Sequence, residues 1–491
     1  MQTEQATKPS YDELLAQNAY LKNELAQLRR LIFGQKRERY VPATDDQLRL
    51  EMPVPESLTK PPATEEIRYV RRKQESRAKP HGRNPLPAHL PRKDIIIEPD
   101  EDVTDLQKIG EEITEELEYK PGRLYVNRYI RPKYVRANDQ GIVIGTLPTR
   151  AIEKGIAGPG LLAHILISKY VDHLPLYRQA KRFRREGVEL AESTLGGWVK
   201  ASHELLLPLV ALLRRQVLAA DYLMVDETPI RVLDHSLPKG SRSGYYWVYY
   251  NPLSRLVFFD YQPGRSRAGP NEQLKNFRGY LQTDGYSGYD EVTARKDIVS
   301  MACLAHARRY FVEAQQNDPE RAEWMLAAIQ KLYQIEHQAR EAQMSFDARY
   351  RLRQALAPSI LAEIEAWLKK AATEVLPKSA TGKAVGYMQK RWLALQVYLT
   401  DGRLEIDNNL VENAIRPVAL GRKNYLFAGS NAGAERAASI YSLVNSAALH
   451  NKEPFHYLRD VINRMADHPH KKLADLLPDN WQELSPQNMP A

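Results

Sequence analysis

The sequence predicts a multidomain α/β protein whose core is a mixed β-sheet interrupted by a helical insertion. Two observations favour this fold class. At 491 residues the chain is longer than the ~250–300 residues that one hydrophobic core usually reaches, so several domains are expected. Four apolar runs of strand length lie between residues 221 and 284, and a long stretch with helical periodicity occupies residues 319–398.

Composition limits the partner and the compartment. The chain is 43% hydrophobic and 27% charged with a net charge of +9, which suits a soluble protein with a polyanionic partner. Cys303 is its one cysteine, which excludes intramolecular disulfides and zinc sites built from cysteines. The N-terminus lacks a signal-like segment, and Pro208 breaks the most apolar run before it could span a bilayer. We expect a cytoplasmic, nucleoid-associated protein with no membrane partner.

Residues 1–45 are predicted to form a leucine-zipper coiled coil. Leu14, Leu21 and Leu28 fall at position d, and Asn18 at position a favours a two-stranded coil. A lone amphipathic surface helix is the alternative. A coiled coil would join protomers into a homodimer or a higher oligomer.

A linker and a small β module are expected next. Residues 46–92 are rich in proline and basic residues, so they are either a solvated tail or a linker that follows a phosphate backbone. Residues 93–150 begin strongly acidic and then alternate apolar with basic residues, which predicts a short β-hairpin module.

Residues 151–216 are predicted to be helical. One amphipathic helix covers residues 174–185, Gly187 breaks it, and a second short helix begins near Glu192. Two short helices around a glycine turn resemble a helix-turn-helix that binds double-stranded DNA. The alternative is a pair of packed helices that make no groove contact.

The sheet core is predicted in two parts, residues 217–318 and 400–450, on either side of a helical insertion at residues 319–399. Strand candidates are 221–226, 244–251, 255–261 and 280–284, with a helix near 271–278. Three consecutive strands, a crossover helix and a further strand fit an RNase H-like mixed sheet. In that topology the first and fourth strands are neighbours, which would bring Asp226 and Asp284 together. Residues 451–491 are expected to be a partly ordered C-terminal tail.

Two aspartates at strand ends and one helical glutamate make a candidate metal site. Asp226 and Asp284 each end an apolar strand, and Glu412 follows Asp407 and Asn408, which have the character of helix N-caps. Carboxylates suit Mg²⁺, and two ions about 3.5–4 Å apart can stabilise the attacking and leaving oxygens of phosphodiester cleavage. We therefore expect two Mg²⁺ or Mn²⁺ ions, bound by Asp226, Asp284 and Glu412.

Each of these acids also has a purely structural interpretation. Asp226 and Asp284 could cap turns, and Glu412 could pair with Arg416 on the helix surface. Glu227 is a competing metal ligand, but strand alternation directs it to the opposite face of the sheet.

Cysteine, histidine and basic residues complete the candidate set. The Cys303-x-x-His306 spacing can suit a metal, but without other cysteines a local structural or substrate-contact role for residues 303–309 is preferred. Basic and hydroxyl side chains near the helices and the metal site are the candidates for phosphate contact. They are Arg178, Arg184, Ser193, Thr194, Lys200, Arg308, Arg309, Arg416, Arg422 and Lys423.

These segments together resemble the DDE transposases of the bacterial insertion sequence 66 family. The matching segments are Val225-Asp226-Glu227-Thr228, Thr283-Asp284-Gly285-Tyr286, and residues 89–92, 169–170, 173–178, 287–289, 303–309, 407–409, 412–413, 415–417, 422–424 and 427–430. The N-terminal zipper is similar too, and the resemblance covers nearly the whole chain.

The resemblance implies an RNase H-like catalytic core with a helical insertion. It also implies Mg²⁺-dependent strand cleavage and strand transfer at the element's terminal inverted repeats, with companion proteins of the same element as further partners. The catalytic triad then maps to Asp226, Asp284 and Glu412, with Glu405 and Asp407 as alternatives for the third position.

One departure from the family pattern concerns zinc. The family's module between the zipper and the helix-turn-helix usually carries paired cysteines, whereas residues 98–144 contain none. We therefore expect a β module without zinc, or one held by partner contacts.

A transposase is the function that we expect. One alternative is a DNA-binding regulator or architectural protein derived from such an element, without catalysis. The intact acids argue against it, and the missing cysteines argue mildly for it. The other alternative is an RNase H-like nuclease that cuts DNA without joining it.

Overall fold

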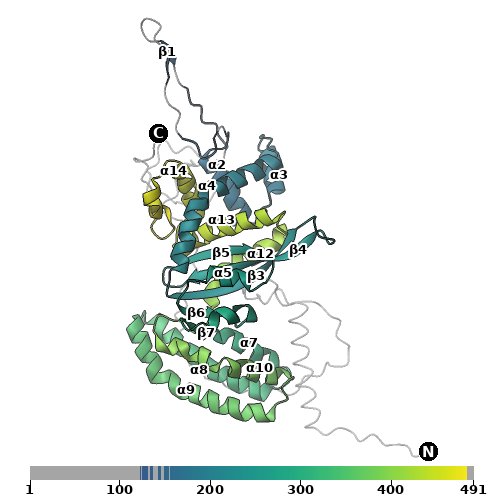
Figure 1. Ribbon diagram of the computed structural model, residues 1–491, viewed down its shortest axis with the longest axis vertical. Helices are drawn as coiled ribbons and strands as arrows, with labels where there is room; N and C mark the ends of the chain where they lie inside the picture. The colour runs from purple at the N-terminus through teal and green to yellow at the C-terminus, as the bar shows by residue number, and fades with distance from the viewer. Residues whose placement is uncertain are drawn as a thin grey trace, which may run out of the picture. The chain divides into compact units, whose positions relative to one another are not determined.

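The structure, a computed structural model, describes residues 122, 124–130, 133–135, 142–144, 149–153 and 155–483 (Figure 1). The chain divides into two units, Met1–Tyr125 and Val126–Ala491, and nearly all the described residues belong to the second. The predicted zipper and basic linker lie outside the described residues. Of the predicted β module, the structure shows an antiparallel pair, β1 (Lys133–Val135) and β2 (Ile142–Ile144).

A five-stranded mixed sheet, in the order β5-β4-β3-β6-β7, forms the centre of the second unit. Its strands are β3 (Tyr222–Leu233), β4 (Ser241–Asn251), β5 (Leu256–Gln262), β6 (Gly279–Thr283) and β7 (Ile298–Ala302). The first three run antiparallel, and β6 and β7 run parallel to β3. The expected adjacency of the first and fourth strands is confirmed, because β3 pairs directly with β6. The chain is thus a mixed α/β protein.

Alternation along β3 and β4 defines the two faces of the sheet. Tyr246 packs edge-on against Tyr441, whereas its neighbour Trp247 packs edge-on against Tyr289 on the opposite face. Both faces are covered, which explains why the strands read as nearly continuous aromatic and β-branched runs.

Within the described part of the chain, three helices precede the sheet: α2 (Pro159–Tyr170), α3 (Leu176–Arg185) and α4 (Glu192–Leu218). The prediction of a short second helix was wrong, since α4 runs for 27 residues and includes Pro208. Leu206, Leu209 and Leu213 are fully buried along it. Their burial against the rest of the fold outweighs the helix-breaking tendency of the proline, because tertiary packing supplies most helical stability. Gly187, with φ +84°, does end the α3 segment as expected.

A helical layer lies beyond the β7 edge of the sheet, away from α4 and α13 (Figure 1). Short elements α5 (Ala268–Gln273), η4 (Ser287–Tyr289) and α6 (Asp290–Thr293) connect the strands, and α7 (Leu304–Ala314) follows β7. The helical layer itself consists of α8 (Pro319–Glu341), α9 (Phe346–Glu374), α10 (Ala380–Lys390), α11 (Trp392–Gln396) and η5 (Val397–Thr400).

A buried ionic cluster of Glu336, Arg349, Arg353 and Glu405 ties the helical layer to the chain that returns to the core. Arg353 is fully buried, pairs with Glu336 at 2.7 Å and donates to the carbonyl oxygen of Leu404 at 2.8 Å. Arg349 bridges Glu336 and Glu405. The cluster therefore fixes residues 404–405, a few positions before the next core helix.

The returning chain forms α12 (Asn409–Tyr425), α13 (Asn431–Leu449), α14 (Pro454–Met465) and η6 (His470–Leu476). Hydroxyls of Ser442 and Ser446 on α13 accept hydrogen bonds from backbone N–H groups of the edge strand β5, at 2.9 and 3.0 Å. These contacts cover an edge that would otherwise present free donors.

The expectation of a partly ordered C-terminal tail was wrong for residues 454–483. Trp481 is buried, stacks edge-on against Tyr457 and donates its indole N–H to Asp460 at 2.7 Å. Apolar residues of α14 pack against α2, which the composition of the tail did not indicate. Among the described residues, no helix combines the length and apolar character needed to cross a bilayer.

Candidate functional site

Parallel pairing of β3 with β6 places Asp226 beside Asp284. Met224 pairs with Gln282, and each aspartate lies two residues further along the chain, Asp226 within β3 and Asp284 directly after β6. Side chains two residues apart share a face, so both carboxylates leave the same face of the sheet. The prediction that Asp226 ends its strand was wrong, because β3 continues to Leu233. Asp226 accepts the Glu227 N–H at 2.8 Å, and Asp284 accepts the Tyr286 N–H at 2.8 Å.

Helix α12 brings Glu412 to the same face. Arg422 of this helix donates to the hydroxyl of Thr228 at 2.7 Å, and Thr228 shares its face of β3 with Asp226. Glu412 lies in the first turn of α12, where a carboxylate is favoured by the helix dipole.

The charges of the neighbouring acids affect the pKa of Asp226. Burial raises the pKa of Asp226 to about 8, and the charges of Glu227, Asp284 and Glu412 add to the rise. A carboxyl group that is costly to ionise without a cation is characteristic of a site that binds one. The three carboxylates could therefore hold divalent ions.

Glu227 points to the opposite face, as strand alternation predicted. It accepts a hydrogen bond from the Tyr289 hydroxyl at 2.7 Å and forms an ion pair with Arg265. Arg265 in turn stacks on the ring of Tyr286, 3.7 Å from its centroid. Burial raises the pKa of Glu227, while the Tyr289 and Arg265 contacts oppose the rise.

The two alternatives for the third acid are both engaged elsewhere. Glu405 binds Arg349 through two hydrogen bonds of 2.8 Å. Asp407 accepts the Tyr333 hydroxyl at 2.8 Å and the Asn409 N–H at 3.1 Å, so it caps the helix. Asn408 occupies the N-cap position, but its side chain makes no capping hydrogen bond, contrary to expectation.

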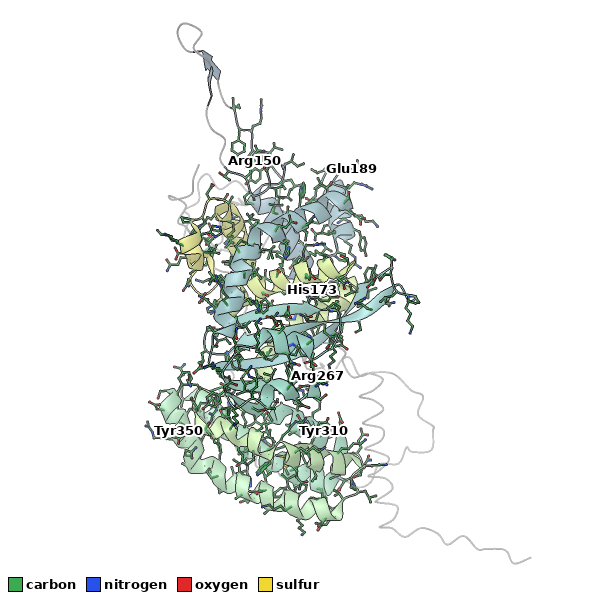
Figure 2. All side chains as sticks on the ribbon, in the orientation of Figure 1. Arg150, His173, Glu189, Arg267, Tyr310 and Tyr350 are labelled. Atoms are coloured by element: carbon green, nitrogen blue, oxygen red, sulfur yellow. The ribbon has the colours of Figure 1, made fainter. Side chains whose placement is uncertain are left out.

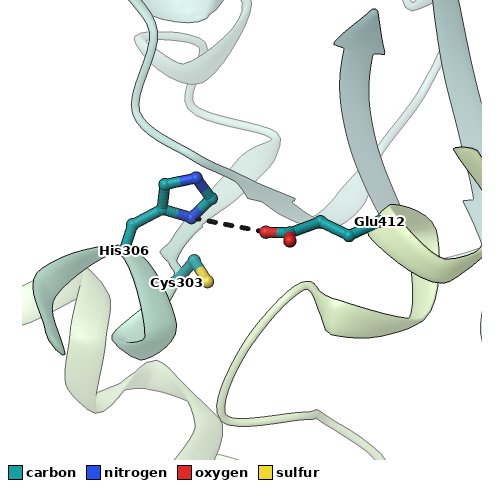
Figure 3. A group of neighbouring side chains, drawn as sticks. All are labelled: Cys303, His306 and Glu412. Carbon is teal, nitrogen blue, oxygen red and sulfur yellow. Dashed lines mark ion pairs between the residues drawn. The ribbon is translucent and has the colours of Figure 1, made fainter. Parts of the chain in front are cut away.

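Glu412 contacts His306 and Arg309 rather than Arg416. Its Oε1 lies 3.8 Å from Nδ1 of His306 (Figure 3). Its Oε2 lies 3.9 Å from Arg309. The surface pair with Arg416 that would explain Glu412 structurally does not occur among the described ion pairs. Cys303, one turn before His306, is fully buried, and burial raises the pKa of its thiol to about 12.

Contacts from the helical layer hold the Asp284 loop in place. Tyr387 donates its hydroxyl to the carbonyl of Asp284 at 2.7 Å, and Arg391 donates to the carbonyl of Gly285 at 2.6 Å. Gly285 has φ +83°, and a Cβ there would collide with the Arg391 side chain. Figure 2 labels Tyr310, whose ring lies 4.6 Å from that of Tyr387. Sequence reasoning missed Tyr387 and Arg391, since nothing near them in the chain marks them.

The candidate DNA-contacting residues fall into two groups. On α3 and α4, Arg184 pairs with Glu189 at 3.0 Å and Lys200 approaches Glu204 at 3.7 Å, while Ser193 and Thr194 are exposed in the first turn of α4. Arg178, also on α3, donates to the hydroxyl of its neighbour Tyr177 at 3.0 Å.

The second group lies around α7 and α12. Arg416 and Lys423 are exposed on α12, Arg309 faces Glu412, and Arg308 lines a cavity of about 510 Å³ beside α8. Arg422 is tied to Thr228 and to the carbonyl of Pro229, so it anchors α12 to β3.

Comparisons with protein families match most of the chain. Residues 154–436 match the transposase IS66 family, residues 20–95 match a transposase C of IS166 homeodomain, and residues 442–478 match an IS66 C-terminal element.

A fourth match corrects the expectation about zinc. Residues 101–135 match the zinc-finger binding domain of transposase IS66, which points to zinc and contradicts the prediction that none is bound. Those residues contain no cysteine or histidine, the ligands usual in structural zinc sites. The donor set of this segment is limited to oxygen ligands, and no zinc ligand is assigned within it.

Curated relatives extend over nearly the full length. The uncharacterized protein y4jD of Sinorhizobium fredii (strain NBRC 101917 / NGR234) is 34% identical over 94% of both chains. The uncharacterized protein y4hP of the same organism is 33% identical over 95% of this chain and 89% of its own. With a transposase match over more than half of its residues and relatives of this similarity, the chain belongs to the IS66 family of transposases.

Proposed function

We propose that the chain is a DDE transposase with an RNase H-like core that cleaves DNA at the ends of its element and joins them to a target. The observation that carries the proposal is the convergence of Asp226, Asp284 and Glu412 on one face of the sheet, with charges close enough to raise the pKa of Asp226. Family membership supports the activity, and the strand order and directions support the RNase H-like assignment.

Asp226, Asp284 and Glu412 would hold two Mg²⁺ or Mn²⁺ ions. Their oxygen donors fit these hard cations, which would supply Lewis-acid stabilisation of the attacking and leaving oxygens. The protein's part is to position the carboxylates. Asp226 is fixed by the pairing of β3 with β4, and the Asp284 loop after β6 is clamped by Tyr387 and Arg391.

DNA is proposed to contact two regions. Exposed Ser193 and Thr194 begin α4 and follow the basic helix α3, an arrangement suited to a helix-turn-helix on the terminal repeats. Exposed Arg416 and Lys423 lie on the helix that carries Glu412, where they could contact the phosphates of the reacting strand. The N-terminal coiled coil would join the protomers that bind two ends.

Strand transfer by the purified full chain on pre-cleaved end DNA tests the proposal. Asp226→Asn, Asp284→Asn and Glu412→Gln should each abolish Mg²⁺-dependent joining, by a factor of at least about 1000, while end binding is retained. Asp290→Asn, an exposed acid near the Asp284 loop, is the matched control and should join normally.

Three outcomes would contradict parts of the proposal. Joining by the Asp226→Asn or Asp284→Asn variant would refute the triad. Loss of joining in Glu405→Gln, but not in Glu412→Gln, would identify Glu405 rather than Glu412 as the third metal ligand. Binding without joining by the unmodified chain would favour a DNA-binding regulator derived from a transposase, and cleaved ends without joined products would favour a nuclease.

A further inference from the structure

Three potential metal ligands of mixed chemistry meet beside the proposed acidic site. Sγ of Cys303, a ring nitrogen of His306 and a carboxylate oxygen of Glu412 all lie within 4.8 Å of one another (Figure 3). Cys303 and His306 come from the start of α7, and Glu412 comes from α12, more than a hundred residues later. Figure 3 shows the three side chains converging from two separate segments.

Two polar atoms in this cluster are buried and lack hydrogen-bond partners within the described part of the chain. They are Nδ1 of His306 and Oε1 of Glu412, which face each other at 3.8 Å. An unsatisfied buried polar atom costs about 1–3 kcal/mol, so two such atoms side by side need an explanation. A cation between them would satisfy both, whereas a bound anion would be repelled by the carboxylate.

A backbone hydrogen-bond donor approaches the sulfur of Cys303. The backbone N–H of Asn408 donates to its Sγ at 3.4 Å. Outer hydrogen bonds of this kind stabilise and orient metal ligands. The side chain of Asn408 is fully buried, and neither its oxygen nor its nitrogen has a partner among the described residues. The residue whose N–H binds the sulfur thus carries two further buried polar atoms without partners among the described residues.

The spacing fits a tetrahedral ion after a small contraction. Ligand atoms at about 2.0–2.3 Å from a tetrahedral centre lie about 3.3–3.8 Å apart. The 3.8 Å separation of Nδ1 and Oε1 already meets this, and the 4.8 Å limit for the cluster requires a movement of about 1 Å. His306 and Glu412 are only partly buried, so their side chains can make that adjustment.

We propose that Cys303, His306 and Glu412 bind one Zn²⁺ ion, with a fourth position open to water or a phosphate oxygen. Sulfur and imidazole ligands select a borderline ion such as Zn²⁺ over Mg²⁺, which prefers oxygen. The site shares Glu412 with the proposed catalytic acids but does not depend on catalysis. It is also separate from residues 101–135, which contain neither cysteine nor histidine.

Cobalt spectroscopy tests this site directly. Co²⁺ added to the metal-free full chain should produce a thiolate-to-cobalt charge-transfer band, and Zn²⁺ should displace it. Because Cys303 is the one cysteine of the chain, such a band can come from no other site. The assay needs no DNA and no activity, so its result is independent of the proposed function.

Variants at the two half-buried ligands and at the cysteine complete the test. His306→Ala and Glu412→Gln should each weaken Co²⁺ binding by more than the ~10–100-fold that loss of an outer partner costs. Cys303→Ser should abolish the band, and far-ultraviolet circular dichroism checks that each variant folds. His337→Ala, an exposed histidine paired with Glu341, should change nothing.

Two results would overturn the proposal. One is the absence of a thiolate band in the unmodified, reduced chain at saturating Co²⁺. The other is an unchanged band and affinity in the folded His306→Ala variant. The second would show that a cobalt–thiolate contact forms without the cluster.

Discussion

Replacing Glu336 by Gln should destabilise the protein by about 3–5 kcal/mol, because it removes the shared anion of a buried ionic cluster. Glu336 accepts hydrogen bonds from Arg349 at 2.9 and 2.5 Å and from Arg353 at 2.7 and 2.9 Å. Glutamine offers one acceptor oxygen, and its amide group would face guanidinium donors. The fully buried Arg353 would then lack its counter-ion.

The control is Glu365→Gln on the neighbouring helix. Glu365 pairs with Lys369 at 2.8 Å on the surface, so its replacement should leave the stability unchanged within error. Urea denaturation followed by tryptophan fluorescence measures both variants. The stacked pair Trp324 and Trp367 lies within the same helical layer and reports on its unfolding.

The pH dependence of this stability loss follows from the direction in which the pKa of Glu336 is shifted. Burial alone would raise the pKa of Glu336, but the contacts with Arg353 and Arg349 outweigh it and hold the pKa below its ordinary value. A depressed carboxyl pKa contributes stability above the unfolded pKa of about 4.3, and that stability is lost as the pH falls through the folded pKa. The difference between Glu336→Gln and the unmodified chain should therefore narrow below about pH 4. A loss under 1 kcal/mol at pH 7, or one equal to that of the control, would refute this reasoning.

Two further predictions concern the acidic site. Because burial and the neighbouring carboxylates raise the pKa of Asp226 to about 8, ionising it opposes folding, so the metal-free protein should lose stability as the pH rises from about 4 to 8. Melting curves recorded from pH 4 to pH 8, with and without Mg²⁺, test this. Mg²⁺ should restore stability near pH 8, and Asp226→Asn should remove both the pH dependence and the effect of Mg²⁺. A melting temperature that does not change with pH would contradict the raised pKa of Asp226. Tyr387→Phe deletes a 2.7 Å hydrogen bond to the Asp284 carbonyl and should slow strand transfer about fivefold, equivalent to about 1 kcal/mol, with end binding unchanged. Tyr350→Phe, at an exposed position on α9, is its control in the same joining assay (Figure 2), and an equal loss in both variants would refute the clamp.

Local patterns were sufficient to predict four of the five strands and the adjacency of β3 and β6, whereas β7 was not among the strand candidates. Strand alternation is a property of consecutive residues, and a crossover between parallel strands restricts which strands can be neighbours. The same alternation separated Asp226 from Glu227, which the structure places against Tyr289 and Arg265.

The predictions that were wrong also have physical reasons. The long α4 and the folded residues 454–483 depend on burial against distant segments, and neither Pro208 nor the composition of the tail carries that information. The zinc prediction was wrong because the absence of cysteines was taken as evidence about a whole segment, whereas the family match to residues 101–135 points to zinc.

The sequence by itself determined the class of this protein, four strands of its sheet and the candidate carboxylates, because these follow from residue type and short-range periodicity. Tertiary structure alone decided what surrounds those carboxylates. The clamp of Tyr387 and Arg391 on the Asp284 loop, and the meeting of Glu412 with His306, join residues about a hundred positions apart. Such contacts arise from how helices pack against the sheet, and no local pattern encodes that packing.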